Sequence, residues 1–258
     1  MITLTTDFGL SDHFVGTMKG VILGICPDAR IVDISHDVGA YGIAEGAFLV
    51  AQAYRYFPRG TVHVIVIDPG VGTSRRAIVA EAAGQRFVAP DNGVLSFIYA
   101  REKHKVRGIT AEKYFLKNVS QTFHGRDIFS PVGAHLARGV APAKLGKPIT
   151  DYMRLHLEKP VRTARRGWTG AVLKIDHFGN LITNFPAEEF RELSQRAFEV
   201  SVGLETVNRM ARSYAECGPG ELFVIVGSSG YLEISSSQAS AAKILGCGVG
   251  APVEVRIY

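Results

Sequence analysis

Cysteine is scarce in this sequence, and the few cysteines lie far apart. Cys26, Cys217 and Cys247 form no Cys-X-X-Cys pair, and no two histidines have the His-X-X-X-His spacing of a metal site. This distribution predicts neither a structural zinc site nor a disulfide framework. We therefore expect buried free thiols in a reducing compartment.

Long apolar runs and concentrated charge are also missing. No apolar stretch approaches the ~20 residues that span a bilayer, and the N-terminal MITLTTDFG resembles a strand rather than a signal peptide. The net charge is +5, but Lys and Arg are scattered, with pairs such as Arg75-Arg76 as the densest runs. A nucleic-acid surface needs a basic stripe with interleaved aromatics, which is absent. We predict a cytoplasmic protein whose partner is a small molecule, with no membrane and no nucleic acid.

The first half of the chain alternates strand-like and helix-like segments. The run TVHVIVI is almost continuously apolar, which is typical of a strand buried on both faces. Apolar residues at helical spacing separate such runs. The alternation predicts an α/β domain, a layered sheet with flanking helices on both sides. The expected strands are 2–6, 31–34, 61–67 and 86–89, and the expected helices are 12–25, 42–56 and 128–137.

From Trp168 onward the pattern changes to short, closely spaced strands separated by Gly-rich and Ser-rich turns. Helical spacing is limited to 187–195 and 238–245. This pattern is typical of an all-β barrel or sandwich. We predict an α/β domain over 1–155, a linker over 156–167 and an all-β, barrel-like domain over 168–258. The expected strands are 168–175, 180–185, 198–202, 222–226, 231–235 and 253–258.

Four polar clusters lie at the ends of predicted strands in the first domain, where open α/β sheets bind their ligands. In TTDFGLSD, Asp12 begins a predicted helix, so it either caps that helix or accepts both hydroxyls of a ribose. In IDPGVGTSRR, Asp68 ends the apolar strand and Arg75 follows a Gly-rich excursion. Turn chemistry accounts for Asp-Pro-Gly but not for the arginine. A carboxylate and a guanidinium that converge there make a charged, hydrogen-bonded site.

Three further segments carry polar residues. TFHGRDIF places His124 just before a helix whose expected cap is Asp127. PDNG is interpreted as a turn, and Asn92 is assigned no chemistry. In the second domain, DHFGNLITN gathers Asp176, Asn180 and Asn184 around a glycine. Amides of this kind suit the donor and acceptor edge of a purine, and a hairpin turn explains them equally well.

Taken in chain order, these segments resemble one family. TTDFGLSDHFVGTMKG, ISHDV, VIDPGVGTSRR, APDNG, FHGRDIFSPVGAHLA and DHFGNLITN are similar to the S-adenosylmethionine hydroxide adenosyltransferases, relatives of the fluorinases and chlorinases. The resemblance implies an enzyme that hydrolyses S-adenosyl-L-methionine to adenosine and L-methionine, with no cofactor and no metal. It also implies an α/β domain followed by a β-barrel, and a homotrimer whose active sites lie between one subunit's first domain and its neighbour's second.

The resemblance implies a role for each matching residue. Asp68, Arg75 and His124 match the set that holds and activates the attacking water. The matching substrate-binding residues are Asp12 for the ribose hydroxyls, Tyr41 and Phe123 as pocket-wall aromatics, Asn180 for adenine, Asp176 for the amino-acid end, Tyr214 against the base and Ser228 for the methionine portion. The sequence departs from the halogenases at two positions, where Ser229 and Ser236 replace arginine.

The substrate's sulfonium is already a leaving group, so the enzyme must supply a well-oriented nucleophile rather than an acid. We expect Asp68 and His124 to accept hydrogen bonds or a proton from water, while Arg75 fixes Asp68. Three other functions agree less well with these residues. In an adenosyl halogenase, the electrostatic repulsion between the Asp68 carboxylate and a halide at contact would cost about 4 kcal/mol at an effective dielectric near 20. In a metal-dependent hydrolase built on Asp12, Asp68 and His124, Arg75 would repel the cation. A non-catalytic adenosine or S-adenosylmethionine sensor does not need the Asp-Arg-His set.

Overall fold

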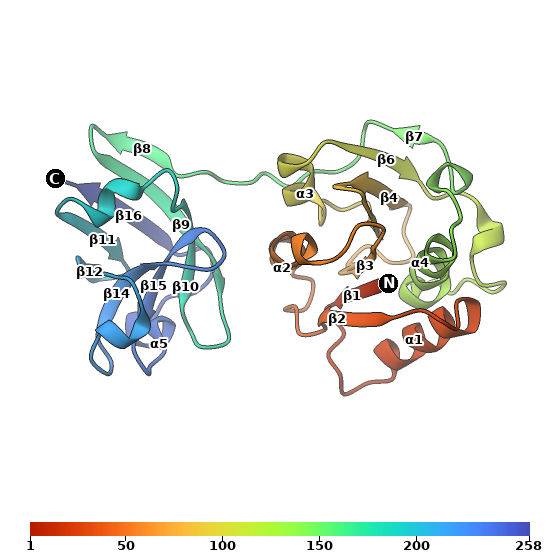
Figure 1. Ribbon diagram of the computed structural model, residues 1–258, viewed down its shortest axis with the longest axis horizontal. Helices are drawn as coiled ribbons and strands as arrows, with labels where there is room; N and C mark the ends of the chain where they lie inside the picture. The colour runs from red at the N-terminus through yellow and green to blue at the C-terminus, as the bar shows by residue number, and fades with distance from the viewer. The chain divides into compact units, whose positions relative to one another are not determined.

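Two β-sheets organise the chain in the computed structural model, which describes residues 1–258 (Figure 1). The sheets belong to two compact units, residues 1–157 and residues 158–258. Each unit has its own buried apolar core. The chain therefore has two domains, the first of mixed α/β structure and the second built mainly from strands.

Unit 1 is built on a seven-stranded sheet. Its strands are β1 (Ile2–Thr6), β2 (Ile31–Ser35), β3 (Val62–Val66), β4 (Ala77–Ala82), β5 (Gln85–Pro90), β6 (His104–Gly108) and β7 (Pro148–Ile149). The strand order is β2-β1-β3-β5-β4-β6-β7. The first four of these run parallel to one another, and β4, β6 and β7 pair antiparallel. The four predicted strands are confirmed, and β4, β6 and β7 are additional.

Helices cover both faces of this sheet, as the alternating pattern predicts. They are α1 (Phe14–Ile25), α2 (Ile43–Ala53), α3 (Ser96–Arg101) and α4 (Ser130–Ala137). Figure 1 shows α1 beside α4 on one face and α2 beside α3 on the other. On the first face, Met18 and Ile22 of α1 and Val132 of α4 share a buried core with Leu4 and Val64 of the central strands.

Two helix starts differ from the prediction. Helix α1 is preceded by His13 at the N-cap position, without a side-chain cap. Asp12 lies one residue too early to reach the free N–H groups of the first turn, so it is not the N-cap. The chain enters α4 through a π-helical turn, Gly125–Phe129. Asp127 lies inside this turn with its side chain completely buried, so it does not cap a helix either.

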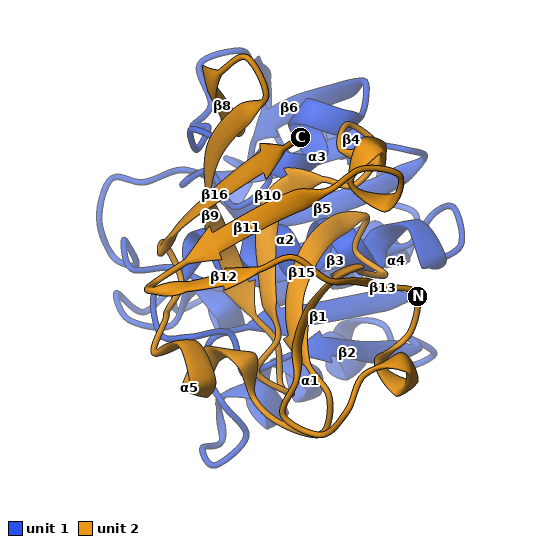
Figure 2. Ribbon diagram, turned by 90° about the vertical axis from the view of Figure 1, so that its left-hand side faces the viewer, with its two compact units in different colours: residues 1–157 blue, residues 158–258 orange.

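Unit 2 contains a nine-stranded sheet. Its strands are β8 (Val161–Ala164), β9 (Gly167–Ile175), β10 (Leu181–Pro186), β11 (Phe198–Val202), β12 (Glu205–Val207), β13 (Met210–Ala211), β14 (Leu222–Val226), β15 (Tyr231–Ser236) and β16 (Pro252–Ile257). The order is β12-β11-β16-β9-β10-β15-β14-β13, with β8 paired to β9. The sheet curls enough to bring β12 against β14, and Figure 2 shows the strand direction turning along it. Closure into a barrel stays a prediction. Of the two segments with helical spacing, 238–245 contains the short helix α5 (Ala241–Leu245), whereas 187–195 forms only the 3-10 turn Arg191–Ser194.

The segment expected to be a linker, 156–167, contains strand β8. All four of its residues are exposed, so no apolar alternation identifies the strand in the sequence. Its pairing with β9 provides the missing stabilisation, and Arg162 lies over the ring of Trp168, 5.7 Å from the ring centroid. The strand conformation of this segment therefore depends on pairing with β9 rather than on an apolar pattern of its own.

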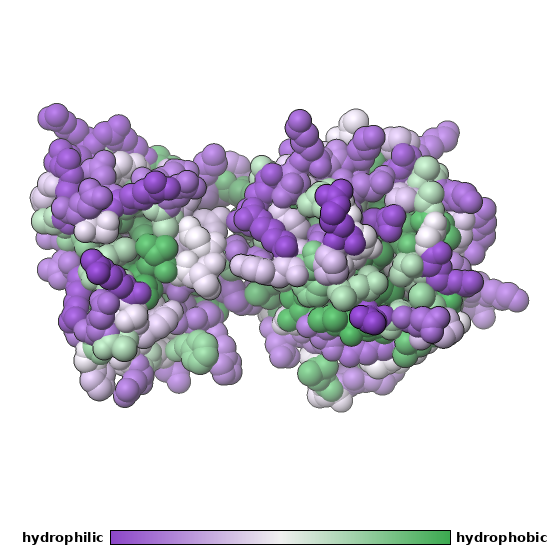
Figure 3. Space-filling view, viewed as in Figure 1, coloured by the Kyte–Doolittle hydropathy of each residue, from purple (hydrophilic) through white to green (hydrophobic).

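All three cysteines are free; Cys217 is buried, whereas Cys26 and Cys247 are partly buried. None of the helices combines the length and the apolar character needed to cross a membrane. Figure 3 shows polar side chains over most of the drawn face, with apolar side chains gathered on unit 1 near β1 and β2. Exposed apolar residues of this part of the chain include Leu10 and Tyr41.

Candidate active site

Four loops of unit 1 leave the sheet at the same edge. They follow the parallel strands β1, β2, β3 and β5 at their carboxyl ends. Open α/β sheets bind ligands at this edge. The loop after β1 carries Asp12, the loop after β2 carries Tyr41, the loop after β3 carries Asp68 and Arg75, and the turn after β5 carries Asn92.

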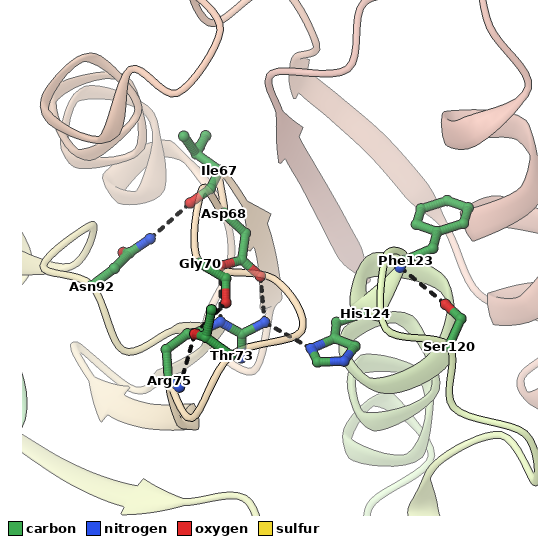
Figure 4. Close-up of polar contacts among 9 residues, drawn as sticks. All are labelled: Ile67, Asp68, Gly70, Thr73, Arg75, Asn92, Ser120, Phe123 and His124. Carbon is green, nitrogen blue, oxygen red and sulfur yellow. Dashed lines mark hydrogen bonds and ion pairs between the residues drawn. The ribbon is translucent and has the colours of Figure 1, made fainter.

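Asp68, Arg75 and His124 are in direct contact (Figure 4). Arg75 donates through Nε to Oδ1 of Asp68 at 2.8 Å, and through Nη2 to Oδ2 of the same carboxylate. The Nη2 group also donates to Nδ1 of His124 at 2.9 Å. One guanidinium thus joins two residues, Asp68 and His124, that lie 7 positions before it and 49 positions after it along the chain.

The charges in this group are largely removed from water. The Asp68 side chain is 4% exposed and that of Arg75 is 11% exposed, and the guanidinium lies 5.1 Å from the ring centroid of Phe129. Burial lowers the pKa of His124, and the positive charge of Arg75 lowers it further. Because Nδ1 accepts a hydrogen bond from Arg75, the neutral imidazole carries its proton on Nε2. Asp12, Asp68 and His124 do not form a group that could hold a metal ion.

The loop after β3 is fixed by its own hydrogen bonds and by one close backbone contact. Thr73 Oγ1 donates to the Gly70 carbonyl at 2.7 Å and accepts from the Arg75 N–H at 3.3 Å. Gly72 has φ +77°, and a Cβ at this position would lie 2.2 Å from the carbonyl oxygen of Gln121. The loop that carries Asp68 therefore rests directly on the backbone just before His124.

Asn92 supports the site although its turn was assigned no chemistry. Its Nδ2 donates to the Ile67 carbonyl at 2.8 Å, and its Oδ1 accepts from the Val94 N–H at 3.2 Å. Ile67 directly precedes Asp68, so this side chain fixes the end of β3 where the carboxylate begins. PDNG forms a turn, as the sequence predicts. The role of the Asn92 amide depends on the neighbouring strand β3, whose end it binds.

Asp127 anchors the segment that carries His124. Its Oδ2 accepts from the Ser120 N–H at 2.8 Å, and Arg126 donates to both carboxylate oxygens, at 2.6 and 3.0 Å. Ser120 Oγ in turn accepts from the Phe123 N–H at 3.0 Å. Although burial acts to raise it, the hydrogen bonds from Arg126 and Ser120 hold the pKa of Asp127 below its usual value. The π-helical turn is thus built around a buried carboxylate that remains charged.

The other candidate residues of unit 1 have different environments. Asp12 is exposed in the loop before α1. Tyr41 is 73% exposed and has φ +64°, and its N–H donates to Oδ2 of Asp7 at 2.9 Å. Phe123 is 8% exposed and packs edge-on against Phe14, with ring centroids 5.2 Å apart. Phe123 is therefore part of the apolar core, whereas the ring of Tyr41 is open to solvent.

In unit 2, Asp176 and Asn180 are bound to each other in the turn between β9 and β10. Asp176 Oδ1 accepts from the N–H groups of Phe178 and Asn180, both at 2.9 Å. Its Oδ2 accepts from the Asn180 side-chain amide at 2.9 Å. The hairpin-turn interpretation is therefore confirmed for these two residues. Tyr214, 46% exposed, and Ser228, also exposed, are accessible to a ligand.

Comparison with known proteins adds a second line of argument. A family model described as the SAM hydroxide adenosyltransferase N-terminal domain matches residues 2–146, and the model of the corresponding C-terminal domain matches residues 170–254. A protein of Salinispora tropica, named (R)-S-adenosyl-L-methionine hydrolase, is 37% identical over 253 residues, covering 96% of this chain and 95% of the relative. A fluorinase of Nocardia brasiliensis is 27% identical over 290 residues, covering 100% of this chain and 97% of the relative.

A solved structure is also similar over the full length. It is the crystal structure of an uncharacterized conserved protein from Thermotoga maritima, 38% identical in sequence, with a TM-score of 0.94. The match covers 99% of this chain and 100% of the other.

The environment of His124 makes its titration a direct test of the Arg75 contact. We expect the His124 imidazole to titrate below its ordinary pKa of 6.5. Replacement of Arg75 by Gln removes a positive charge 2.9 Å away, so the midpoint should rise. NMR titration of the histidine side chains measures both values. His135, whose pKa is lowered by burial and by Arg138, is an internal control that should not move. An unchanged His124 midpoint would contradict the contact.

The backbone contact at Gly72 predicts an effect on stability. Gly72→Ala introduces a Cβ that cannot fit beside the Gln121 carbonyl, whereas Gly60, with φ +84°, has open space. Both substitutions force alanine into a left-handed conformation, which costs about 1–2 kcal/mol. The clash should lower the free energy of unfolding of Gly72→Ala by a further ~1–3 kcal/mol relative to Gly60→Ala. Urea denaturation measures the free energy of unfolding of both variants. Equal losses of stability would show that the loop of Gly72 is not in tight contact with the backbone at Gln121.

Proposed function

The chain belongs to the SAM hydroxide adenosyltransferase family, and from that premise we propose that it hydrolyses S-adenosyl-L-methionine to adenosine and L-methionine. The Salinispora relative that matches it over nearly the whole length is named as a hydrolase of this compound. The observation that carries the proposal is the buried Asp68–Arg75–His124 group at the ligand-binding edge of the sheet.

The reaction requires a nucleophile more than it requires an acid. Attack at the ribose 5′ carbon expels neutral methionine from a sulfonium, so the leaving group needs no proton. Holding water in line with the breaking carbon–sulfur bond can contribute about 7–11 kcal/mol through orientation. Bulk water has a pKa of about 15.7, so the site must also increase the negative charge on the attacking oxygen. A hydrogen-bond acceptor with a fixed charge meets that need.

Within the group, we assign the acceptor role to Asp68. Arg75 occupies one acceptor position on each oxygen of this carboxylate, and a carboxylate has about four. The remaining positions can accept a proton or a hydrogen bond from water. His124 offers water a hydrogen-bond donor rather than an acceptor, because its Nδ1 already accepts from Arg75 and its Nε2 carries a proton. In place of the acceptor role expected from the sequence, we assign His124 two others: its Nδ1 accepts from the guanidinium, and its Nε2 offers a donor.

The substrate-binding roles implied by the family remain proposals, and the structure supports them unequally. The exposed side chains of Asp12, Tyr41, Tyr214 and Ser228 can meet a ligand without rearrangement. The amide of Asn180 already donates to Asp176, so adenine would use its Oδ1 or displace that contact. Phe123 is part of the buried core, so it would support the pocket from behind rather than contact the ligand through an exposed ring. We also carry over from the family, as proposals, the homotrimer, the cytoplasmic location and the absence of cofactor and metal.

Oxygen-18 water distinguishes hydrolysis from the alternatives. Incubation with S-adenosyl-L-methionine should place the label in the 5′ hydroxyl of adenosine, because water forms the new bond. The reaction is run with chloride or fluoride present, and with and without a chelator. Halogenated adenosine as the main product would establish a halogenase instead, a loss of turnover with chelator would establish a metal enzyme, and binding without turnover would establish a sensor.

Asp68→Asn tests the acceptor role while preserving the size of the side chain. The amide loses the negative charge, so we expect kcat to fall by roughly 10²–10⁴-fold, the range for loss of a general base. KM should change little, because the lost interaction acts mainly in the transition state. Asp28→Asn, at an exposed position, is the control. Near-normal kcat in Asp68→Asn would mean that this residue serves only the turn. Removing the charge should also weaken the repulsion of halide, so chloride-dependent turnover is measured in the same variant.

A further inference from the structure

The loop of residues 68–75 runs from the end of β3 to the start of β4, and the turn after β5 binds both of its ends. At the start, the Asn92 amide donates to the Ile67 carbonyl at 2.8 Å (Figure 4). At the end, Arg76 donates through Nε to Oδ2 of Asp91 at 2.9 Å. The Asp91 N–H donates in return to the Arg76 carbonyl, also at 2.9 Å. Asp91 and Asn92 are consecutive, so a single turn brackets the whole loop.

The ion pair between Arg76 and Asp91 differs from an ordinary surface pair. The Asp91 side chain is 3% exposed, and Nη2 of Arg76 lies 2.7 Å from its Oδ2. The other carboxylate oxygen, Oδ1, accepts from the Met153 N–H at 2.8 Å, so both oxygens are bound. Arg76 also donates to Oδ1 of Asp151 at 2.8 Å, but that carboxylate is 75% exposed. Exposed ion pairs contribute little to stability, so the anchor of Arg76 is Asp91.

The segment 151–155 lies against the same turn. It has no helix or strand of its own, so side chains of the turn bind its N–H groups. In addition to the Met153 bond, the Leu155 N–H donates to Ser96 Oγ at 2.7 Å. Gly93 has φ +91°, and a Cβ at this position would lie 3.0 Å from the Leu155 nitrogen. The turn therefore contacts both this segment and the loop after β3, which leaves it little freedom to shift.

We propose that Asp91 and Arg76 are positioning residues for the hydrolysis, a role that rests on the proposed function. Arg76 directly follows Arg75, so the bond to Asp91 fixes the backbone from which the Arg75 side chain extends. The Arg75 guanidinium has to meet Asp68 and His124 at once, at 2.8 and 2.9 Å. The hydrogen bonds within the loop set its internal shape, whereas the turn sets where its two ends lie. Displacement of the end would draw Arg75 away from its partners, and a misplacement of about 1 Å can lower a rate about 100-fold.

Asp91→Asn tests this role and preserves the size of the side chain. An amide has one acceptor oxygen and one donor nitrogen, so it cannot accept from both Arg76 and Met153. We expect kcat for S-adenosyl-L-methionine to fall roughly 10- to 100-fold, with little change in KM. Displacement of Arg75 should also raise the titration midpoint of His124, measured by NMR, because a positive charge moves away from the imidazole. A change that affected only the stability of the fold would move neither value.

Glu81→Gln is the matched control for loss of an ion pair. It removes a pair on the same sheet, with Arg107 at 3.6 Å, that involves no residue of the loop. Neither kcat nor the His124 midpoint should change in this variant. Arg76→Lys keeps a cation for Asp91 but lacks the planar fork of the guanidinium, so both changes should be present and smaller. The lysine variant serves with the same two measurements if Asp91→Asn does not fold.

The possible outcomes separate positioning from a structural role. A normal kcat or an unmoved His124 midpoint in the folded variant would overturn the positioning role, even where its thermal stability is reduced. Failure of the unmodified protein to cleave S-adenosyl-L-methionine would instead overturn the proposed function. The two failures are distinct, because the His124 midpoint is measured without turnover and reports the position of Arg75 directly.

Discussion

The candidate site depends on one guanidinium with two partners. Arg75 holds both oxygens of Asp68 and donates to Nδ1 of His124. The Asp68 side chain is 4% exposed and forms an ion pair with this cation, and removal of one partner from a buried pair costs about 3–5 kcal/mol. The same cation determines which nitrogen of His124 carries the proton. The ion pair of Asp68 and the tautomer of His124 therefore both depend on a single side chain.

Much of the fold could be predicted from the sequence where burial on both faces leaves a continuous apolar run, as in β3. The strands that were not predicted have weaker local signals. Strand β4 is rich in alanine, β6 carries charged residues, and β8 is exposed throughout. These strands are stabilised by pairing with a neighbour, and pairing partners are not visible in a local pattern. Asp12 illustrates the same limit, because its position relative to the first turn of α1 depends on a helix boundary.

The candidate site was predictable to the extent that its residues form long motifs. Asp68, Arg75 and His124 stand in recognisable segments, and the structure adds how they touch. Asn92 carries no comparable signal. It follows β5 and acts on the end of β3, the strand that pairs with β5, so its role depends on a pairing that the local sequence does not show.

The close contact at Gly72 also determines which parts of the ligand-binding edge can move. The loop of Asp68 and the segment of His124 are in direct backbone contact, so neither can move toward the other. On the other side of the edge, the strained backbone of Tyr41 is tied to Asp7 by one hydrogen bond, with its ring in solvent. The Tyr41 carbonyl also accepts a hydrogen bond from the Ile43 N–H at 2.9 Å, so the left-handed backbone is held on both sides of the residue. The freedom left at this end of the edge is that of the exposed Tyr41 ring about its side-chain bonds, whereas the charged end is fixed by backbone contact.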